Sequence, residues 1–431
     1  MKRRAISTLQ EIKKQINFPS GRNSLHIDSA VVIGGSIAGL TATQVLSQFA
    51  RQVTIIDRDH MIGQNDFRHG APQGRHAHTL LPQGQRELGR LFPNFSERMV
   101  ARGAVVLDDS QDKPFYRDGR WHAASKGSGR TISATRPLIE SVLFEIVSAQ
   151  ENVQIISGVE VSGLATGFEH HRVTGVQLRS RPGFAVDIPE LLPADIVIDT
   201  SGRRSKAPAW LEKLGFTPPE EWQIDSHAGY ATRFFEIPDD FAETWKALYI
   251  LLDPQAGTRG GLLLPVEGNR WHVTLMGVNR DYPPLDEDGF LAFAHSLPSQ
   301  RLFRAIEHAR ALSKPNGYRG TSNQVRRYDM LPRYLEGLLV MGDAVFSMNP
   351  VYAQGMTAVS LGGRALESSL QAWSKKSSLQ GLSRDFQRRL AKQIDPLWKI
   401  AVRHEWQWPE VDLFDNTEQL YPRLDDALAA A

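Results

Sequence analysis

The stretch Val31–Leu40, VVIGGSIAGL, joins an apolar run to a glycine-containing turn and then to a segment with helical spacing. A short apolar run that ends at glycines is typical of a buried parallel strand. The residues that follow place Ile37, Leu40 and Val45 at helical spacing, and QVTIID at 52–57 is predicted to be a second buried strand. A strand–turn–helix–strand unit of this length binds the pyrophosphate of a dinucleotide.

The turn has strict requirements, and this chain departs from the usual pattern at one position. Gly34 permits the tight reversal, and Gly39 lets the helix lie close to the strand. Backbone N–H groups at the start of the helix then face an anion. Ser36 stands where the pattern usually has its second glycine. Serine is small and its hydroxyl can donate to phosphate, so we expect Ser36 to be tolerated.

Asp57 ends the second strand, 23 positions after Gly34. A carboxylate at this position accepts hydrogen bonds from ribose hydroxyls and repels a 2′-phosphate. The first nucleotide is therefore predicted to belong to FAD or NAD rather than NADP.

The bulk composition is that of an ordinary globular protein. The chain has 431 residues, 41% of them hydrophobic and 23% charged, with a formal net charge of +2 and no cysteine. Disulfides, thiolate metal sites and cysteine nucleophiles are excluded, and a reducing cytoplasm is the expected location. There is no basic stripe that would predict nucleic-acid binding.

No apolar run approaches the ~20 residues that a membrane-spanning helix needs. Two interpretations of the basic N-terminal segment 1–18 stay open: a docked or frayed extension, which we favour, and a helix in peripheral contact with a membrane.

Buried-strand signals recur near residues 31, 53, 195 and 338, with other material between them. The expected fold class is therefore α/β: a Rossmann-like domain built from separated segments, with an inserted, mostly antiparallel substrate domain. The expected divisions are an N-terminal extension (1–27), an FAD-binding domain (28–105, 131–221 and 326–395), a substrate domain (106–130 and 222–325) and a C-terminal segment (396–431).

The second half of the chain distinguishes FAD from NAD, because FAD is long enough to need a second clamp. The stretch 336–358, EGLLVMGDAVFSMNPVYAQGMTA, supplies one. A buried strand delivers Asp343 to its carboxyl end, where the side chain can accept from ribityl hydroxyls. Pro350 then leads to Gly355 and Met356, whose amides at a helix start can face the electron-rich edge of a flavin.

With these motifs in place, the chain resembles the flavoprotein monooxygenases typified by para-hydroxybenzoate hydroxylase, over nearly its whole length. Within that group it is most similar to the squalene-epoxidase-like bacterial enzymes that epoxidise polyketide alkenes. The stretches that carry the resemblance are IDRD, GAPQGRHAHTLL, VIDTSGRRS, GYATRFF and GLLVMGDAVFSMNPVYAQGM.

The resemblance implies a cofactor site and a reaction. The implied FAD-binding residues are Gly34, Ser36, Ile37, Ala38, Gly39, Asp57, Arg58, Arg75, Arg136, Val161, Asp343, Pro350, Gly355 and Met356. NADPH or NADH would reduce the flavin transiently, O2 would add to form a C4a-hydroperoxide, and its distal oxygen would pass to the substrate. No catalytic side chain is assigned.

Three positions depart from the family pattern. Ser201 replaces the aspartate of the usual Asp-Gly pair, which leaves a pyridine-nucleotide contact there unassigned. Phe346 replaces a histidine after Gly342-Asp343 and makes that wall apolar, and Ala353 replaces a glycine.

The expected substrate is apolar, of polyketide or terpene type. The candidate pocket residues are Tyr230, Arg233, Phe235, Phe346 and Tyr352, with Arg233 either a pocket cation or an edge residue. Transfer of an electrophilic oxygen to an alkene needs no strong base, whereas phenol hydroxylation benefits from one. The apolar side chains therefore favour epoxidation. The alternatives are an aromatic hydroxylase, a halogenase or a double-bond reductase on the same scaffold, and a non-catalytic flavin-binding auxiliary protein.

Other motifs have simpler explanations. His69, His76 and His78 form no set with carboxylates at ligand spacing, so no metal site is predicted and packing near the flavin is favoured. Trp406 and Trp408 resemble part of a halogenase signature, but their place near the C-terminus favours a segment that closes over the core.

Overall fold

The computed structural model describes residues 27–60, 67–68, 70–123, 129–168, 170–180 and 188–414. The N-terminal segment 1–18 and His69, both discussed above, lie outside the described residues. Within the described ranges, no helix is long and apolar enough to cross a membrane.

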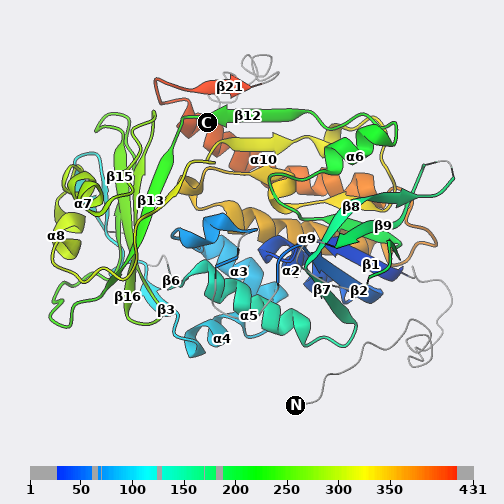
Figure 1. The fold of residues 1–431 in the computed structure, drawn as a ribbon, viewed down its shortest axis with the longest axis horizontal. Helices are drawn as coiled ribbons and strands as arrows, with labels where there is room; N and C mark the ends of the chain where they lie inside the picture. Colours follow the sequence, from blue (N-terminus) through cyan, green and yellow to red (C-terminus); the bar gives the residue numbers. More distant parts are fainter. Residues whose placement is uncertain are drawn as a thin grey trace.

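A five-stranded parallel sheet forms the centre of the larger part of the molecule (Figure 1). Its order is β19-β11-β1-β2-β7, so the chain leaves and re-enters it repeatedly. The register pairs Val31 with both Val197 and Thr54. The strands are β1 (Ile27–Ile33), β2 (Ala50–Asp57), β7 (Val153–Ser157), β11 (Ile196–Asp199) and β19 (Leu338–Val340). The predicted assembly from separated segments is therefore confirmed.

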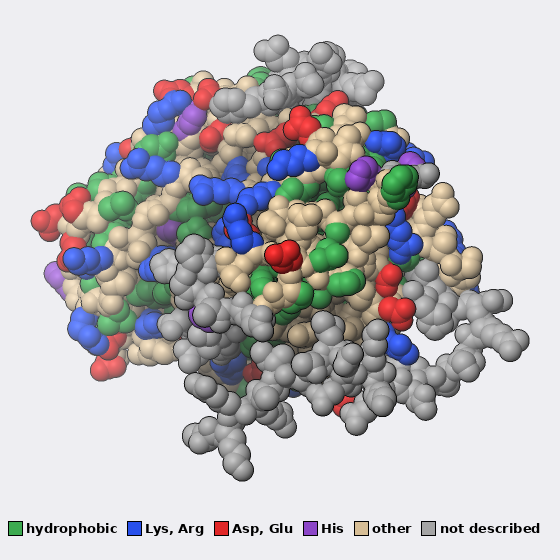
Figure 2. Space-filling model, turned by 45° about the vertical axis from the view of Figure 1, so that its right-hand side comes forward, with side chains coloured by type: hydrophobic (Ala, Val, Ile, Leu, Met, Phe, Trp, Pro, Cys, Tyr) green, Lys and Arg blue, Asp and Glu red, His purple; other side chains and the backbone are tan. Residues whose placement is uncertain are grey.

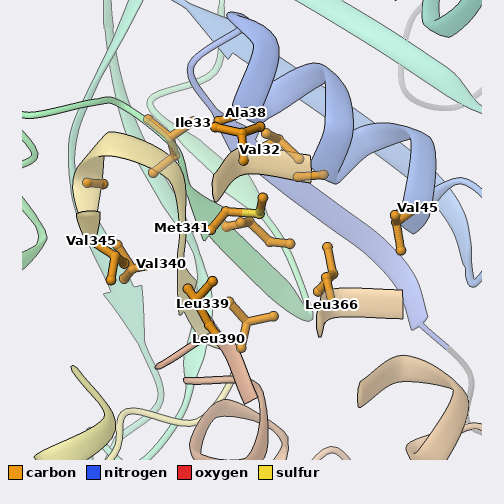
Figure 3. Packing of buried hydrophobic residues seen from close by; sticks show 14 of the residues in the cluster. Val32, Ile33, Ala38, Val45, Leu339, Val340, Met341, Val345, Leu366 and Leu390 are labelled. Carbon is orange, nitrogen blue, oxygen red and sulfur yellow. The ribbon is translucent and has the colours of Figure 1, made fainter. Parts of the chain in front are cut away.

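The helices follow the apolar spacing in the sequence. They are α2 (Ile37–Leu46), α3 (Pro82–Leu91), α4 (Phe95–Ala101), α5 (Arg136–Ser148), α6 (Ala207–Lys213), α7 (Glu287–His295), α8 (Arg301–Ile306), α9 (Gly355–Trp373) and α10 (Leu382–Glu405). Short 3-10 turns occupy Pro72–Arg75, Tyr328–Met330, Gly342–Ala344 and Pro350–Tyr352. Figure 3 shows how the main core forms: Val32 of β1 and Leu339 of β19 meet Val45 of α2, Leu366 of α9 and Leu390 of α10. Burial of these side chains stabilises the parallel sheet. It also holds α2 and α9, the two helices that follow glycine turns, with their starts at the carboxyl end of the sheet.

A seven-stranded sheet, mostly antiparallel, forms the other part of the molecule (Figure 1). In spatial order its strands are β17 (Asn316–Tyr318), β13 (Gly229–Glu236), β16 (Arg270–Gly277), β15 (Arg259–Val266), β14 (Leu248–Ile250), β4 (Phe115–Arg117) and β5 (Arg120–His122). Helices α7 and α8 cover its outer face, where a second hydrophobic cluster includes Phe235, Trp271 and Phe290. A hairpin around Asp118-Gly119 joins β4 to β5, with positive φ at both residues.

Three smaller sheets complete the fold. Their strands are β8 (Val159–Thr166), β9 (Val173–Ser180) and β10 (Leu191–Pro193); β20 (Phe346–Ser347), β18 (Asn323–Arg326), β12 (Glu221–Asp225) and β21 (Asp412–Phe414); and β3 (Val105–Asp108) with β6 (Arg130–Ser133). A buried contact joins the two main parts of the molecule, because Glu267 after β15 accepts hydrogen bonds from the backbone and hydroxyl of Thr135 at the start of α5. The predicted α/β fold with an inserted antiparallel sheet is confirmed.

Candidate functional site

A large cleft lies where the carboxyl ends of β1, β2, β11 and β19 meet the inner face of the seven-stranded sheet. Its empty volume is about 1940 Å³, including solvent at its mouth. Ligands of open parallel sheets bind at this edge. Residues proposed from the sequence that line it are Gly34, Ser36, Ile37, Ala38, Asp57, Arg58, Arg136, Val161, Tyr230, Asp343, Pro350, Gly355 and Met356. On the face drawn in Figure 2, Lys and Arg side chains gather near the centre, next to hydrophobic side chains.

Gly34 and Gly39 make the turn at the floor of the cleft. Gly34 has φ of +97°, and a Cβ there would lie 2.9 Å from the carbonyl oxygen of Thr200. A Cβ on Gly39 would lie 1.8 Å from the carbonyl oxygen of Gly34. Gly39 is not among the residues that line the cleft. It serves the close contact between helix and strand, and so keeps the amino end of α2 facing the cleft.

Ser36 is part of a hydrogen-bonded group with two side chains of α5. Its hydroxyl donates to Glu140 Oε1 at 2.6 Å and accepts from Arg136 Nη2 at 2.9 Å. Arg136 Nε also donates to Glu140 Oε1, at 2.8 Å. Burial raises the pKa of Glu140, but Arg136, Arg68 and the Ser36 hydroxyl outweigh it, so the net shift of the pKa is downward. The carboxylate stays ionised and holds Arg136 at the wall of the cleft.

Asp57 is held in place at the end of β2. Its Oδ2 accepts from the Gly35 backbone N–H at 2.6 Å and pairs with Arg68 Nη2 at 3.3 Å. Its Oδ1 accepts from the Asp59 backbone N–H at 2.8 Å. The carboxylate lines the cleft beside the turn, with its position set before any ligand arrives.

Of two arginines in this region, the one proposed from the sequence lies outside the cleft lining, and the other, which was not proposed, lines the cleft. Arg75 lies over the ring of Phe67, 5.1 Å from its centre, and is not among the lining residues. Arg68, which the sequence did not single out, lines the cleft and donates to the carbonyl oxygen of Gly35 at 3.2 Å. Nothing in its polar loop sequence distinguished it, whereas the spacing of Arg136 and Glu140 on one helix could have indicated their ion pair.

Asp343 lines the cleft at the carboxyl end of β19. Burial raises the pKa of its carboxyl, opposed by the positive charges of Arg136 and Arg203. Among the described residues its carboxylate oxygens have no hydrogen-bond partner, in contrast to Asp57. A buried polar group normally has one, so Asp343 is suited to accept from a ligand. Gly355 and Met356 open α9 on the same side of the cleft.

The inner face of the seven-stranded sheet supplies alternate residues to the cleft. Along β13, Tyr230, Thr232 and Phe234 face the cleft side, where Thr232 contacts His76 and Phe234 stacks on His272. Phe235 packs in the cluster under α7 and α8, and Arg233 pairs with Glu287 of α7 at 3.0 Å. Successive side chains of a strand point to opposite faces, so Tyr230 cannot share a wall with Arg233 and Phe235. The latter two stand outside the cleft.

Phe346 and Tyr352 also lie behind the wall of the cleft rather than in it. The ring of Phe346 packs near Trp398 of α10, with centres 6.5 Å apart. The Tyr352 hydroxyl donates to Glu405 Oε1 at 3.0 Å. Glu405, at the carboxyl end of α10, is a buried carboxylate that no motif in the sequence indicated.

Glu405 organises the turn that precedes α9. It accepts from Asn349 Nδ2 at 3.1 Å, from Asn323 Nδ2 at 2.8 Å and from the Ser226 backbone N–H at 3.1 Å. The Tyr230 hydroxyl, which faces the cleft, donates to the side-chain oxygen of Asn349. Groups far apart in sequence therefore fix the segment that carries Pro350 to the rim of the cleft.

Three histidines stand at or behind this wall: His76 and His272 are buried, and His78 is half-buried. Burial lowers the pKa of His76 to about 4, and it lowers the pKa values of His78 and His272 to about 3, each with help from neighbouring charges. All three are neutral at pH 7. Within the described ranges, no group of His, Asp and Glu has the arrangement of a metal site.

Near the carboxyl end of α10 the two tryptophans differ in burial. Trp408 is buried in a small cluster with Ala228 and Val278, while Trp406 is 47% exposed. Neither lines the cleft.

The fold is that of flavoprotein monooxygenases and flavin-dependent halogenases. PqsL, a probable FAD-dependent monooxygenase from Pseudomonas aeruginosa, is similar with a TM-score of 0.64 and 16% identity, over 89% of this chain and 98% of that chain. The p-nitrophenol 4-monooxygenase PnpA from Pseudomonas putida DLL-E4 gives a TM-score of 0.61 and 17% identity, over 94% of each chain. The flavin-dependent brominase Bmp2 gives 0.63 and 13%, over 93% of each.

The chain belongs to the family of Protein Rv3254 from Mycobacterium tuberculosis (strain ATCC 25618 / H37Rv). The two are 34% identical over 421 residues, which is 92% of this chain and 87% of that protein. No model of a known protein family matches the chain.

Proposed function

We propose that this protein is an FAD-dependent monooxygenase that uses NADH or NADPH as reductant. The observation that carries the proposal is the cleft itself. It joins a dinucleotide-type turn, with Asp57 beside it, to a second anchor at Asp343 and the start of α9. A ligand that uses both anchors must be long, which favours FAD over NAD.

The residues present fit this cofactor. Backbone N–H groups from Ser36 to Ala38 would face the pyrophosphate, with Arg136 and Arg68 beside it. Asp57 and Val161 would contact the adenosine half. The unpartnered carboxylate of Asp343 would accept from the ribityl chain, and the amides of Gly355 and Met356 would face the flavin ring. These roles, like the division into an FAD-binding and a substrate domain, are proposals.

Bound FAD would supply electron transfer from the nicotinamide and activation of O2. The protein's own residues bind, orient and shield. Asp343 fixes the register of the cofactor along the cleft. Leu262, Met276 and Met348 give the part of the cleft near the antiparallel sheet an apolar lining that excludes water.

The finer proposal is epoxidation of an alkene in a largely apolar substrate. Met276 and Met348 support it, because they line the cleft and bring no base. Phe346 and Tyr352 lend it no support, because they lie behind the wall. Hydroxylation of a phenol is the second candidate, and the observation in its favour is the ring of His76 at the cleft.

The test is reconstitution of the purified protein with FAD, followed by NADH or NADPH oxidation under ¹⁸O2. We expect a yellow protein and one ¹⁸O atom in the product. Product formation without O2 would indicate a reductase, and a strict requirement for halide would indicate a halogenase. A protein that takes up no FAD would contradict the proposal.

Asp343→Ala tests the second anchor. Loss of a charge-assisted hydrogen bond worth about 1.5–3 kcal/mol is expected to weaken FAD binding by roughly tenfold or more. Asp240→Ala, at an exposed position of the second part of the molecule, is the matched control and is expected to bind FAD normally. Full flavin occupancy of both variants at limiting FAD would count against the role of Asp343.

A further inference from the structure

The wall of the cleft that comes from the antiparallel sheet and from residues 76–79 carries no charge at neutral pH. Its members on the sheet are Tyr230, Leu262, Thr274, Met276 and Tyr318. The histidines of the segment, His76 and His78, are neutral because their pKa values lie near 4 and 3. An ionised group placed against this wall would lose its hydration and gain no counter-ion from the wall itself, which is costly.

Of the other cations that line the cleft, Arg204 has no hydrogen-bond or ion-pair partner among the described residues and its charge acts on Tyr318. The remaining cations are already engaged. Arg136 donates to Glu140, Ser36 and His78. Arg203 donates to the carbonyl oxygens of Gly320 and Ser322. Arg75, next to His76 in sequence, lies over Phe67 and does not line the cleft.

Of the three histidines, His76 has a ring nitrogen at the cleft without a partner in the described part of the chain. His78 uses both nitrogens: Nδ1 contacts the carbonyl oxygen of His76 at 2.8 Å, and Nε2 contacts Arg136 Nη1 at 3.2 Å. His272 is not a lining residue, and its Nε2 contacts the carbonyl oxygen of Arg75 at 3.1 Å. His76 lines the cleft, its Nδ1 contacts Thr232, and its Nε2 has no partner among the described residues.

The contacts of His76 fix the ring but not the direction of its hydrogen bonds. Nδ1 lies 2.8 Å from Thr232 Oγ1, which lies 2.8 Å from Thr274 Oγ1. Both hydroxyls can donate or accept, so either tautomer of the ring satisfies this chain. The ring also lies against Tyr318, with centres 5.4 Å apart. A ligand hydroxyl suits Nε2 in both cases, because a hydroxyl can donate and accept.

We propose that His76, held by Thr232 and Thr274, binds a hydroxyl group of a neutral, otherwise apolar substrate, and that the uncharged wall selects against carboxylates. The inference deepens the proposed function and rests on it. His76 is thus a specificity-determining residue. Substrates that carry an alcohol or a phenol are preferred over their deoxy and acidic analogues of the same size.

The probes that test this are naphthalene, 2-naphthol and 2-naphthoate, which share one ring system and differ in the polar group. Their dissociation constants are measured at pH 7.5 by calorimetry on the FAD-reconstituted protein. We expect 2-naphthol to bind about fivefold or more tightly than naphthalene, the value of one net hydrogen bond of ~1 kcal/mol. We expect 2-naphthoate to bind at least about tenfold more weakly than 2-naphthol.

Variants assign the effect to His76. His76→Leu is expected to bring 2-naphthol and naphthalene within about twofold of each other, with naphthalene binding retained. His76→Gln, whose amide can reach the place of Nε2, is expected to recover a preference for 2-naphthol. His272→Gln, at a buried histidine outside the cleft lining, is the matched control and is expected to keep the wild-type ratio.

Two results would overturn the inference: 2-naphthoate that binds as tightly as 2-naphthol, or a ratio of 2-naphthol to naphthalene that His76→Leu leaves unchanged. The proposed function fails separately. A protein that takes up FAD and oxidises NADH or NADPH but shows no preference for 2-naphthol refutes the role of His76 alone. A protein that shows the preference without any bound FAD refutes the flavoenzyme proposal alone.

Discussion

Ser36 occupies the position of a glycine in the usual turn, yet its backbone needs no glycine, since its φ is −85°. Its side chain instead connects the turn to α5 through Glu140 and Arg136. The Ser36 hydroxyl donates to the carboxylate of Glu140, and this hydrogen bond explains why a serine stands at the position. The sequence alone suggested only that it could be tolerated.

Ser36→Gly is therefore expected to destabilise the protein rather than improve the turn. Loss of the two hydrogen bonds and the added freedom of the unfolded chain should lower the free energy of unfolding by ~1–2 kcal/mol. Ser36→Ala, which keeps the Cβ and removes only the hydroxyl, should account for most of this loss. Urea unfolding of the three proteins measures it, and a Ser36→Gly variant as stable as the wild type would refute the role of the hydroxyl.

At the scale of elements, α10 acts on the cleft through its last residue. Glu405 accepts hydrogen bonds from Asn323, Asn349 and Tyr352, which belong to the strand and turn before α9. None of these contacts brings a positive charge, so within the described part of the chain amide and hydroxyl donors stabilise the carboxylate. The turn is thereby held rigid at the point where Pro350 lines the cleft.

Glu405→Ala is expected to lower the free energy of unfolding by ~3 kcal/mol or more, because several buried donors lose their partner at once. Glu405→Gln keeps one acceptor oxygen and should lose clearly less. Both variants should also bind FAD more weakly than the wild type, in the same order. Urea unfolding and FAD titration give the two measurements, and equal effects of Ala and Gln would show that the acceptor oxygen is not what matters.

The elements themselves were largely predictable from sequence, while their contacts were not. Apolar runs that end at glycines indicated the parallel strands, and the spacing of Ile37, Leu40 and Val45 indicated α2. The alternation of side chains along a strand can also be read from the sequence. It places Tyr230 on the opposite face of β13 from Arg233 and Phe235. The partners of Glu405 could not be read in advance, because residues 226, 323, 349 and 352 meet it only through the fold.

The same distinction holds for the candidate site. The turn at Gly34 and the segment 342–356 have local patterns, and their residues gather along one cleft. Arg68 lies in a polar stretch without periodicity, and its approach to Asp57 is a contact that the sequence pattern does not indicate. Long-range packing also decides that Phe346 turns toward Trp398 and away from the cleft.

At the scale of the whole molecule, the two large sheets meet across a layer of neutral histidines. His76 and His78 lie in the segment between the sheets, and His272 projects from β16 toward it. Their pKa values in the folded state, about 4 and about 3, lie below the ordinary value of 6.5. At pH values between these and 6.5, the three histidines stay unprotonated in the folded protein, whereas they bind protons in the unfolded chain.

This difference predicts loss of stability in mild acid. Above pH 6.5 the histidines are neutral in both states and contribute no pH dependence. As the pH falls below 6.5, the unfolded chain binds protons first, and each histidine lowers the free energy of unfolding by up to about 1.4 kcal/mol per pH unit until its folded pKa is reached. Between pH 7.5 and 5.0, His272→Gln should consequently lose about 2 kcal/mol less than the wild type. Only the change with pH is compared, so any constant cost of the substitution cancels, as do the carboxyl groups common to both proteins. Urea unfolding at pH 7.5, 6.5, 5.5 and 5.0 measures both curves, and parallel curves would mean that His272 is not held neutral between the two sheets.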